Sequence, residues 1–463
     1  MSDTPTSRAA SEQLTPAVGG EPIEGGIPVG QALEGSTAAA AAIDVETPSL
    51  PRKRVGRSYI TLVTFAAFGG YLALVTPIAL SLSLKVEELA PGHPEILGYI
   101  TGIGAIAALL ATPIIGMFSD RTRSRLGRRR PYLIAGTILG LIALAGLAIA
   151  PNLIVLGIAW VLTQLGWGAM VLPGIIYSQA DKVPEEQRGK VSGLVGFVQN
   201  LGPIVGAGLA SAFIGKDLLV FLVPGVIGAI TIALFVIFVK DDPNPSLVNT
   251  EKLRLSTFFG NLVFNPRKHV DFAWNCLGRV IFNLGLSFST TFTTFFFAAR
   301  MGVTVSQIGG IIVILSIGGV LTGSLGALGG GWLSDKLKRR RLLVMVSAVL
   351  FTAGVLIMAF STALPLLITG SLITSIAVGA FASVDQAIVL DILPERDTDA
   401  GRYIGINNYA TMLPQAIGPL IASVILVIGV TGADKNYGLL FIVAAICTLI
   451  GGSIILAKVR GTR

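Results

Sequence analysis

The chain has 463 residues, of which 52% are hydrophobic and only 13% are charged. A soluble domain carries roughly 25% charged residues, so about half of the usual charged surface is missing. Together with a mean hydropathy of +0.77, this composition indicates a membrane protein and excludes a soluble enzyme, a disordered protein and a fibrous protein. The two cysteines, Cys276 and Cys447, lie in apolar runs and offer neither a disulfide framework nor metal-ligand spacing.

Residues 1–57 predict a disordered cytoplasmic tail. Most of this segment consists of Ala, Gly, Pro, Ser and Thr with scattered acidic residues, a composition that cannot bury a core. The segment also lacks the basic and apolar regions of a signal peptide, so we expect none.

After Arg57, apolar stretches of about 20 residues, each long enough to cross a bilayer, follow one another to the end of the chain. In lipid each stretch must satisfy its own backbone hydrogen bonds, so we expect an all-α membrane protein with twelve transmembrane helices. The predicted spans are Tyr59–Leu84, Ile96–Phe118, Pro131–Ala150, Leu153–Ser178, Gly189–Ile214, Leu218–Val239, Phe272–Ala299, Gln307–Leu333, Leu342–Phe360, Pro365–Leu390, Tyr403–Ile428 and Tyr437–Ala457.

The distribution of basic residues predicts the orientation. With both termini inside, 29 of the 34 Lys and Arg residues fall in inside segments, four fall in outside loops and one, Arg279, falls within a span. This bias predicts a multi-pass protein of the plasma membrane with both termini cytoplasmic. It also accounts for the net charge of +8, so no nucleic-acid partner is needed.

A polar link divides the spans into two sets of six. We therefore expect an N-terminal six-helix bundle over residues 58–239, a cytoplasmic linker over 240–270 and a C-terminal six-helix bundle over 271–459. Within the linker, Leu253–Val263 is apolar enough to lie along the membrane surface.

The two halves carry matching motifs. Gly116-Met-Phe-Ser-Asp120-Arg121 ends the second span, and Gly331-Trp-Leu-Ser-Asp335-Lys336 ends the eighth, 215 residues later. Asp181-Lys-Val-Pro-Glu follows the fourth span, and Asp391-Ile-Leu-Pro-Glu follows the tenth, 210 residues later. A duplicated bundle around a site at the membrane midplane is the architecture of secondary transporters.

At these motifs the chain resembles the major facilitator superfamily. The long form of the loop after the second span, Ser119-Asp120-Arg121-Thr-Arg-Ser-Arg-Leu-Gly127-Arg128-Arg129-Arg130-Pro131, is similar to that of the sucrose/proton symporters and the wider glycoside–cation symporter group. The fourth span departs from that group, because no arginine lies between Pro173 and Asp181, where the group usually carries one soon after a mid-helix proline. The resemblance implies alternating access around a cavity lined by helices 1, 4, 7 and 10.

Charged residues at the motifs and inside the spans are the candidate coupling or gating residues. We expect Asp120 to contact the opposite bundle and close the cytoplasmic side, with Arg121 beside it and Asp335 in the matching position. Arg279 and Asp385 lie ~12 Å and ~9 Å from the cytoplasmic ends of their helices and should face the interior, each near the other. Two interpretations stay open for this pair, proton coupling or static bracing of the C-terminal bundle.

Uncharged polar residues on the expected cavity helices, with Asn200 added from the fifth span, are the candidate substrate contacts: Gln164, Tyr177, Asn200, Asn283 and Gln386. Amides, hydroxyls and aromatic rings suit a sugar, whereas the alternative for each amide is to bridge neighbouring helices. Trp167 is either a stacking platform or a packing residue.

The predicted function is secondary active transport of a small polar solute, with a sugar or glycoside carried by proton symport as the first hypothesis. The alternatives are efflux of an amphipathic compound by proton antiport and a non-transporting membrane receptor or sensor. The sequence shows no nucleotide-binding motif, catalytic set or metal cluster, so we expect neither an enzyme nor a cofactor. We expect a monomer whose partners are the solute, a coupling proton and the lipid bilayer.

Overall fold

The computed structural model describes residues 54–240, 264–395, 399–430 and 435–461. Throughout these ranges the regular structure is helical, with no β-strand. The proposed surface segment Leu253–Val263 and all but the last residues of the predicted tail lie outside the described residues.

Six spans form the N-terminal bundle. The first and the fourth are each continuous spans that contain a π-helical segment, written η. The elements are α2 (Arg57–Thr76), η1 (Pro77–Ser81), α3 (Leu82–Leu89), α4 (Glu95–Arg121), α5 (Arg130–Ala148), α6 (Leu153–Thr163), η2 (Gln164–Val171), α7 (Leu172–Lys182), α8 (Glu185–Ala212) and α9 (Asp217–Phe238).

Six further spans form the C-terminal bundle. Its first span is a pair of helices bent by 48° at Phe292. The elements are α11 (Val270–Thr291), α12 (Thr293–Met301), the 3₁₀ segment η4 (Val305–Ile308), α13 (Gly309–Leu337), α14 (Arg340–Phe360), α15 (Leu364–Ile392), α16 (Ala400–Leu426) and α17 (Tyr437–Lys458).

The lengths and hydropathy of these helices confirm the predicted fold class. Within the described residues, eleven helices are individually long and apolar enough to cross a membrane, and the bent pair α11–α12 makes a twelfth. A helix satisfies most of its backbone hydrogen bonds internally, which the absence of water in a hydrocarbon core requires.

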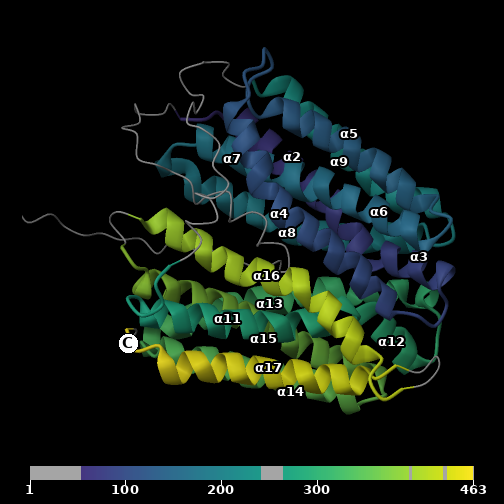
Figure 1. Cartoon of the computed structure of the whole chain (residues 1–463), viewed down its shortest axis with the longest axis vertical. Helices are drawn as coiled ribbons and strands as arrows, with labels where there is room; N and C mark the ends of the chain where they lie inside the picture. The colour runs from purple at the N-terminus through teal and green to yellow at the C-terminus, as the bar shows by residue number, and fades with distance from the viewer. Residues whose placement is uncertain (1–53, 241–263, 396–398, 431–434, 462–463) are drawn as a thin grey trace, which may run out of the picture.

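The two bundles lie side by side, with the early helices on one side and the late helices on the other (Figure 1). Within the N-terminal bundle α2 packs on α8 and α9, and within the C-terminal bundle α15 packs on α13 and α14. The bundles meet along α4 with α16 and along α8 with α13. Because the number of spans is even, the described chain begins and ends on one face, which we call the terminal face; the opposite face is the distal face.

Glycines allow a close helix approach in the N-terminal bundle. A Cβ at Gly166 in η2 would lie 2.7 Å from the carbonyl oxygen of Gly136 in α5, so only glycine allows this spacing. Trp167 fills the space beside this contact, with its indole nitrogen against Gly140. Trp167 therefore has the packing role and not that of a stacking platform.

Candidate functional site

A cavity of about 220 Å³ lies between the two bundles. Its walls come from α2, η1, α4, α6 and η2 of the N-terminal bundle and from α11 and α16 of the C-terminal bundle. This volume is somewhat below the ~300–1,000 Å³ of typical small-molecule sites, so the cavity is sized for one small solute. None of the described residues that line it is charged.

Polar side chains from both bundles line the cavity. Gln164, the first residue of η2, is 7% exposed, and its side chain makes no hydrogen bond to any described residue. On the other side Asn283 donates from its Nδ2 to the carbonyl oxygen of Arg279 (2.9 Å), which leaves its side-chain oxygen as an acceptor. Ser287, one turn further along α11, adds a hydroxyl. Gln164 and Asn283 therefore face one space from opposite bundles, and Gln415 of α16 adds a third amide to the same lining.

Trp160 supplies an aromatic surface to the same cavity. Its ring lies against Gly104 of α4, where a Cβ would come within 2.4 Å of the indole nitrogen. The residue is fully buried, so its position is fixed by packing.

Three other predicted substrate contacts are not among the residues that line this cavity. Tyr177 lies nearer the terminal face, where its hydroxyl packs against Gly116 and its ring contacts Arg129. Asn200 is buried in α8 and donates to the carbonyl oxygen of Gly196 (2.6 Å), a bond within its own helix. Gln386 is exposed on α15.

Arg279 and Asp385 form an ion pair inside the C-terminal bundle. Asp385 is fully buried and Arg279 is 8% exposed. The Arg279 guanidinium also donates to the Thr411 hydroxyl (2.7 Å) and to the Asn407 side-chain oxygen (3.3 Å), and Asn275 donates to Asp385 (3.3 Å). These polar partners compensate for burying the two charges.

This network borders the cavity without lining it. Asn283, which lines the cavity, bonds to the main chain of Arg279, and Met412, also in the lining, follows Thr411 in α16. A movement of the ion pair can therefore be transmitted to the cavity wall through Asn283 on α11 and Met412 on α16.

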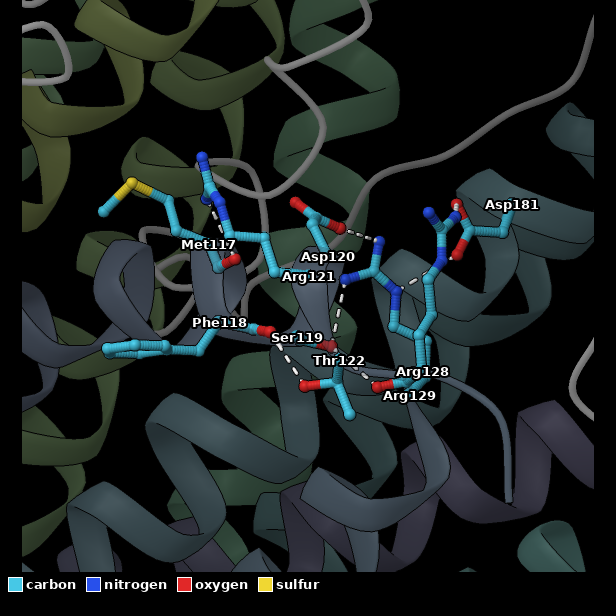
Figure 2. A network of polar contacts seen from close by, with 9 residues as sticks. All are labelled: Met117, Phe118, Ser119, Asp120, Arg121, Thr122, Arg128, Arg129 and Asp181. Atoms are coloured by element: carbon cyan, nitrogen blue, oxygen red, sulfur yellow. Dashed lines mark hydrogen bonds and ion pairs between the residues drawn. The ribbon is translucent and has the colours of Figure 1, made fainter. Parts of the chain in front are cut away.

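A second charged cluster lies at the terminal face of the N-terminal bundle. Arg129 pairs with Asp120 at the end of α4 (2.6 Å) and with Asp181 in α7 (3.1 Å), and it donates to the Ser119 hydroxyl (3.1 Å) (Figure 2). Burial lowers the pKa of Arg129, but Asp181 and Asp120 outweigh burial, so the pKa lies above its ordinary value and the guanidinium stays charged.

The partner of Asp120 differs from the predicted one. We expected a contact with the opposite bundle, whereas Asp120 pairs with Arg129 of its own bundle. The loop after α4 folds back over the helix end through Gly127, whose φ of +91° favours glycine, and this turn returns Arg129 to Asp120. Arg121 donates to the carbonyl oxygen of Met117 in its own helix (3.2 Å).

The C-terminal bundle repeats this cluster. Arg340 pairs with Asp335 at the end of α13 (3.7 Å) and with Asp391 at the end of α15 (2.7 Å). In each bundle one arginine thus joins the acidic residues that end the second and the fourth spans. The duplicated motifs of the sequence correspond to duplicated ion-pair clusters.

Several functional candidates were missed in the sequence. Asn275, Asn407 and Thr411 complete the network of Arg279 and Asp385, and Trp160 and Ser287 line the cavity. The adjacent amides Asn407 and Asn408 in an apolar helix were a usable signal, because polar residues in a membrane span seek a partner.

Comparison with curated proteins gives relatives that are named for different substrates. The multi-drug resistance efflux pump PmrA of Streptococcus pneumoniae is 24% identical over 379 residues, which cover 77% of this chain and 86% of the pump. Myo-inositol transporter 3A of Cryptococcus neoformans is 32% identical over 132 residues, covering 28% of this chain and 20% of that protein. The glucose transporter GlcP of Staphylococcus epidermidis is 44% identical over 85 residues, 18% of each chain.

Solved structures share the fold. The nucleoside transporter NupG superposes with a TM-score of 0.69 at 13% identity, covering 86% of this chain and 98% of NupG. A bacterial homologue of the lysosomal transporter Spinster, in an inward-facing and unoccupied conformation, gives a TM-score of 0.65 at 15% identity, with 88% and 98% covered.

The family assignment rests on a match along almost all of the helical part. The model of the Major Facilitator Superfamily matches residues 58–328 and 320–462. With the twelve spans and the cavity between two bundles, this match shows that the chain is a transporter belonging to the Major Facilitator Superfamily.

Proposed function

We propose that this transporter carries a small, uncharged, polyhydroxylated solute, a sugar or glycoside, together with a proton. The observation that carries the proposal is the cavity between the bundles, which has amides from both bundles, hydroxyl groups, and no charged residue in its described lining. Amides both donate and accept, so Gln164 and Asn283 suit hydroxyl groups, which do the same.

The relatives give partial support for this solute class. Stretches similar to a myo-inositol transporter and a glucose transporter cover 28% and 18% of this chain. Inositol and glucose are both neutral polyols, the chemistry that an uncharged cavity with amides favours.

The proton is assigned to the network of Arg279 and Asp385. Asp385 is the buried acidic residue closest in the network to the cavity wall, which it reaches through Arg279 and Asn283. Protonation of Asp385 would remove its charge and weaken its bond to Arg279. Asp120, Arg121 and Asp335 are assigned to gating at the terminal face.

The proposed topology completes this assignment. Both termini are assigned to the cytoplasm, because the segments on their side of the predicted topology carry 29 basic residues and the opposite loops carry four. The protein is further proposed to be a monomer of the plasma membrane. Residues 58–239 and 271–459 are the proposed bundles and 240–270 the cytoplasmic linker. The terminal face is then cytoplasmic and the distal face external.

A second candidate function is efflux of an amphipathic compound by proton antiport. Two observations favour it: the relative with the most extensive alignment described above is a multi-drug efflux pump, and Leu, Ile, Ala and Met side chains make up much of the cavity wall. The two candidates predict opposite directions of transport in the same vesicles.

Transport by purified protein in proteoliposomes tests the proposal. Labelled glucose, sucrose, maltose and myo-inositol are supplied outside at acidic pH, with neutral pH inside. Symport predicts accumulation of at least one sugar above its external concentration, and its loss when a protonophore removes the gradient. Extrusion of a fluorescent amphipathic dye, with no sugar accumulated, would instead establish efflux.

Paired amide variants connect transport to the cavity. Gln164→Leu should raise the half-saturating sugar concentration about fivefold, because a substrate hydrogen bond worth about 1 kcal/mol is lost from a buried site. Asn200→Leu is the matched control: it also removes a buried amide, but one that bonds within α8 away from the cavity. Equal effects of the two substitutions would contradict a specific role for Gln164.

A further inference from the structure

The two bundles are in close contact near the distal face. A Cβ at Gly98 of α4 would come within 2.1 Å of the Ser423 hydroxyl of α16, and one at Gly102 within 2.6 Å of Leu420. The two glycines therefore allow α4 and α16 to touch. Thr101, between them in sequence, lines the cavity, so this contact lies at the distal end of the cavity.

Other contacts between the bundles lie near the same face. The Thr294 hydroxyl of α12 donates to the carbonyl oxygen of Ala79 in η1 (3.1 Å). Gly309, at the start of α13, packs against Ser211 near the end of α8. At the terminal face, by contrast, Asp120 and Asp335 each pair with an arginine of their own bundle.

Glu95 is the point where polar contacts between the bundles converge. Its main-chain oxygen accepts a hydrogen bond from Ser423 (2.7 Å), and its carboxylate forms an ion pair with Lys435 (3.1 Å), the residue that precedes the cap of α17. His93 of its own bundle contacts the other carboxylate oxygen (2.8 Å). The side chains of Glu95 and Lys435 are only 13% and 7% exposed.

We propose that Glu95 and Lys435 form a distal latch, an ion pair that must break before the cavity opens to the distal face. Both charges are shielded from water while the bundles touch, and both regain hydration when the bundles separate. The desolvation cost thus offsets much of the attraction, which makes the contact reversible. Glu95 is also in the first turn of α4, where the helix dipole favours an acidic residue.

The latch rests on the alternating access of the proposed function but on neither its solute nor its proton. A labelling experiment therefore tests it separately from transport. The parent protein carries Cys276→Ser and Cys447→Ser, which remove both native cysteines, and Thr101→Cys, which places one thiol in the distal part of the cavity. A membrane-impermeant thiol reagent is applied from the distal side of reconstituted vesicles, without substrate.

Breaking the latch should expose the Thr101→Cys thiol. Glu95→Gln and Lys435→Gln should each raise the distal labelling rate on the order of tenfold, because one charge is left without its partner in the closed form and is stable only when hydrated. Ser423→Ala, which removes the neighbouring hydrogen bond, should raise the rate by a smaller factor. The charge exchange Glu95→Lys with Lys435→Glu should restore protection.

Lys85→Gln is the matched control. Lys85 is 6% exposed near the distal face and pairs with Asp217 (2.7 Å), but both residues belong to the N-terminal bundle. Its substitution should leave the labelling rate at the parent value. Unchanged labelling in Glu95→Gln and Lys435→Gln, or an equal increase in Lys85→Gln, would overturn the latch. If the unmodified protein transports no sugar but the variants show the expected labelling pattern, the proposed solute is refuted and the latch is not.

Discussion

Arg279 and Asp385 show how two charges are kept inside an apolar bundle. Asp385 bonds to Arg279 and Asn275, and the guanidinium also bonds to Thr411 and Asn407. Three helices, α11, α15 and α16, thereby share one polar network. An ion in lipid without such partners costs at least ~2.5–3.5 kcal/mol, so the surrounding amides and hydroxyl are part of the site.

Removing one charge of this pair should destabilise the protein more than removing both. We expect Asp385→Asn and Arg279→Gln each to lower the free energy of unfolding by about 3 kcal/mol, because the remaining ion is buried without its counterion. The double variant should recover most of the loss, since no net charge then remains in the network. Thermal unfolding of the purified variants in detergent measures the difference. Additive losses in the double variant would show that the two residues act independently.

At the scale of helices, Arg129 connects the terminal ends of α4 and α7. Its side chain is 7% exposed and bridges Asp120 and Asp181, and Arg340 does the same for α13 and α15 through Asp335 and Asp391. One planar guanidinium can bind two carboxylates at once, which a point charge does less well. Each bundle therefore has its second and fourth spans joined at the terminal face and can move as a unit.

Loss of this bridge should weaken the N-terminal bundle. Arg129→Gln should cost about 2 kcal/mol of stability, below the value for a fully buried pair because Asp120 and Asp181 are 33% and 25% exposed. Arg129→Lys should recover part of it. Arg123→Gln, an exposed arginine of the same loop, is the control and should leave the unfolding temperature unchanged. Equal unfolding temperatures for Arg129→Gln and Arg123→Gln would exclude a bridging role.

The sequence predicts the helices more fully than it predicts which way their side chains face. Span length follows from bilayer thickness, so the sequence predicts all twelve spans. The bend at Phe292 does not change the length or hydropathy of its span, so the sequence does not predict it. The rotation of each helix is hard to infer because lipid and protein interior are both apolar. For this reason the sequence does not determine which candidate amides reach the cavity: Gln164 and Asn283 line it, whereas Asn200 and Gln386 do not.

At the scale of the whole molecule, the two halves are duplicated at the terminal face but differ inside. Both have an arginine between two acidic residues, whereas the buried pair of Arg279 and Asp385 belongs to the C-terminal bundle. The N-terminal bundle contributes Gln164 and Trp160 to the cavity. The C-terminal bundle contributes polar lining residues as well, among them Asn283, Ser287 and Gln415, so the asymmetry between the halves lies in the buried ion pair.

The double variant Asp385→Asn with Arg279→Gln separates coupling from bracing. Because it restores electrical balance in the network, it should fold well enough for transport to be measured. If Asp385 carries the coupled proton, the variant should exchange labelled for unlabelled sugar across the vesicle membrane yet fail to accumulate sugar in a pH gradient. Exchange moves no net proton, so it needs no titratable group. Accumulation in a pH gradient requires a group that binds and releases the coupled proton. Accumulation equal to that of the unmodified protein would show that the pair only braces α11 against α15, and the coupling proton would then have to bind elsewhere.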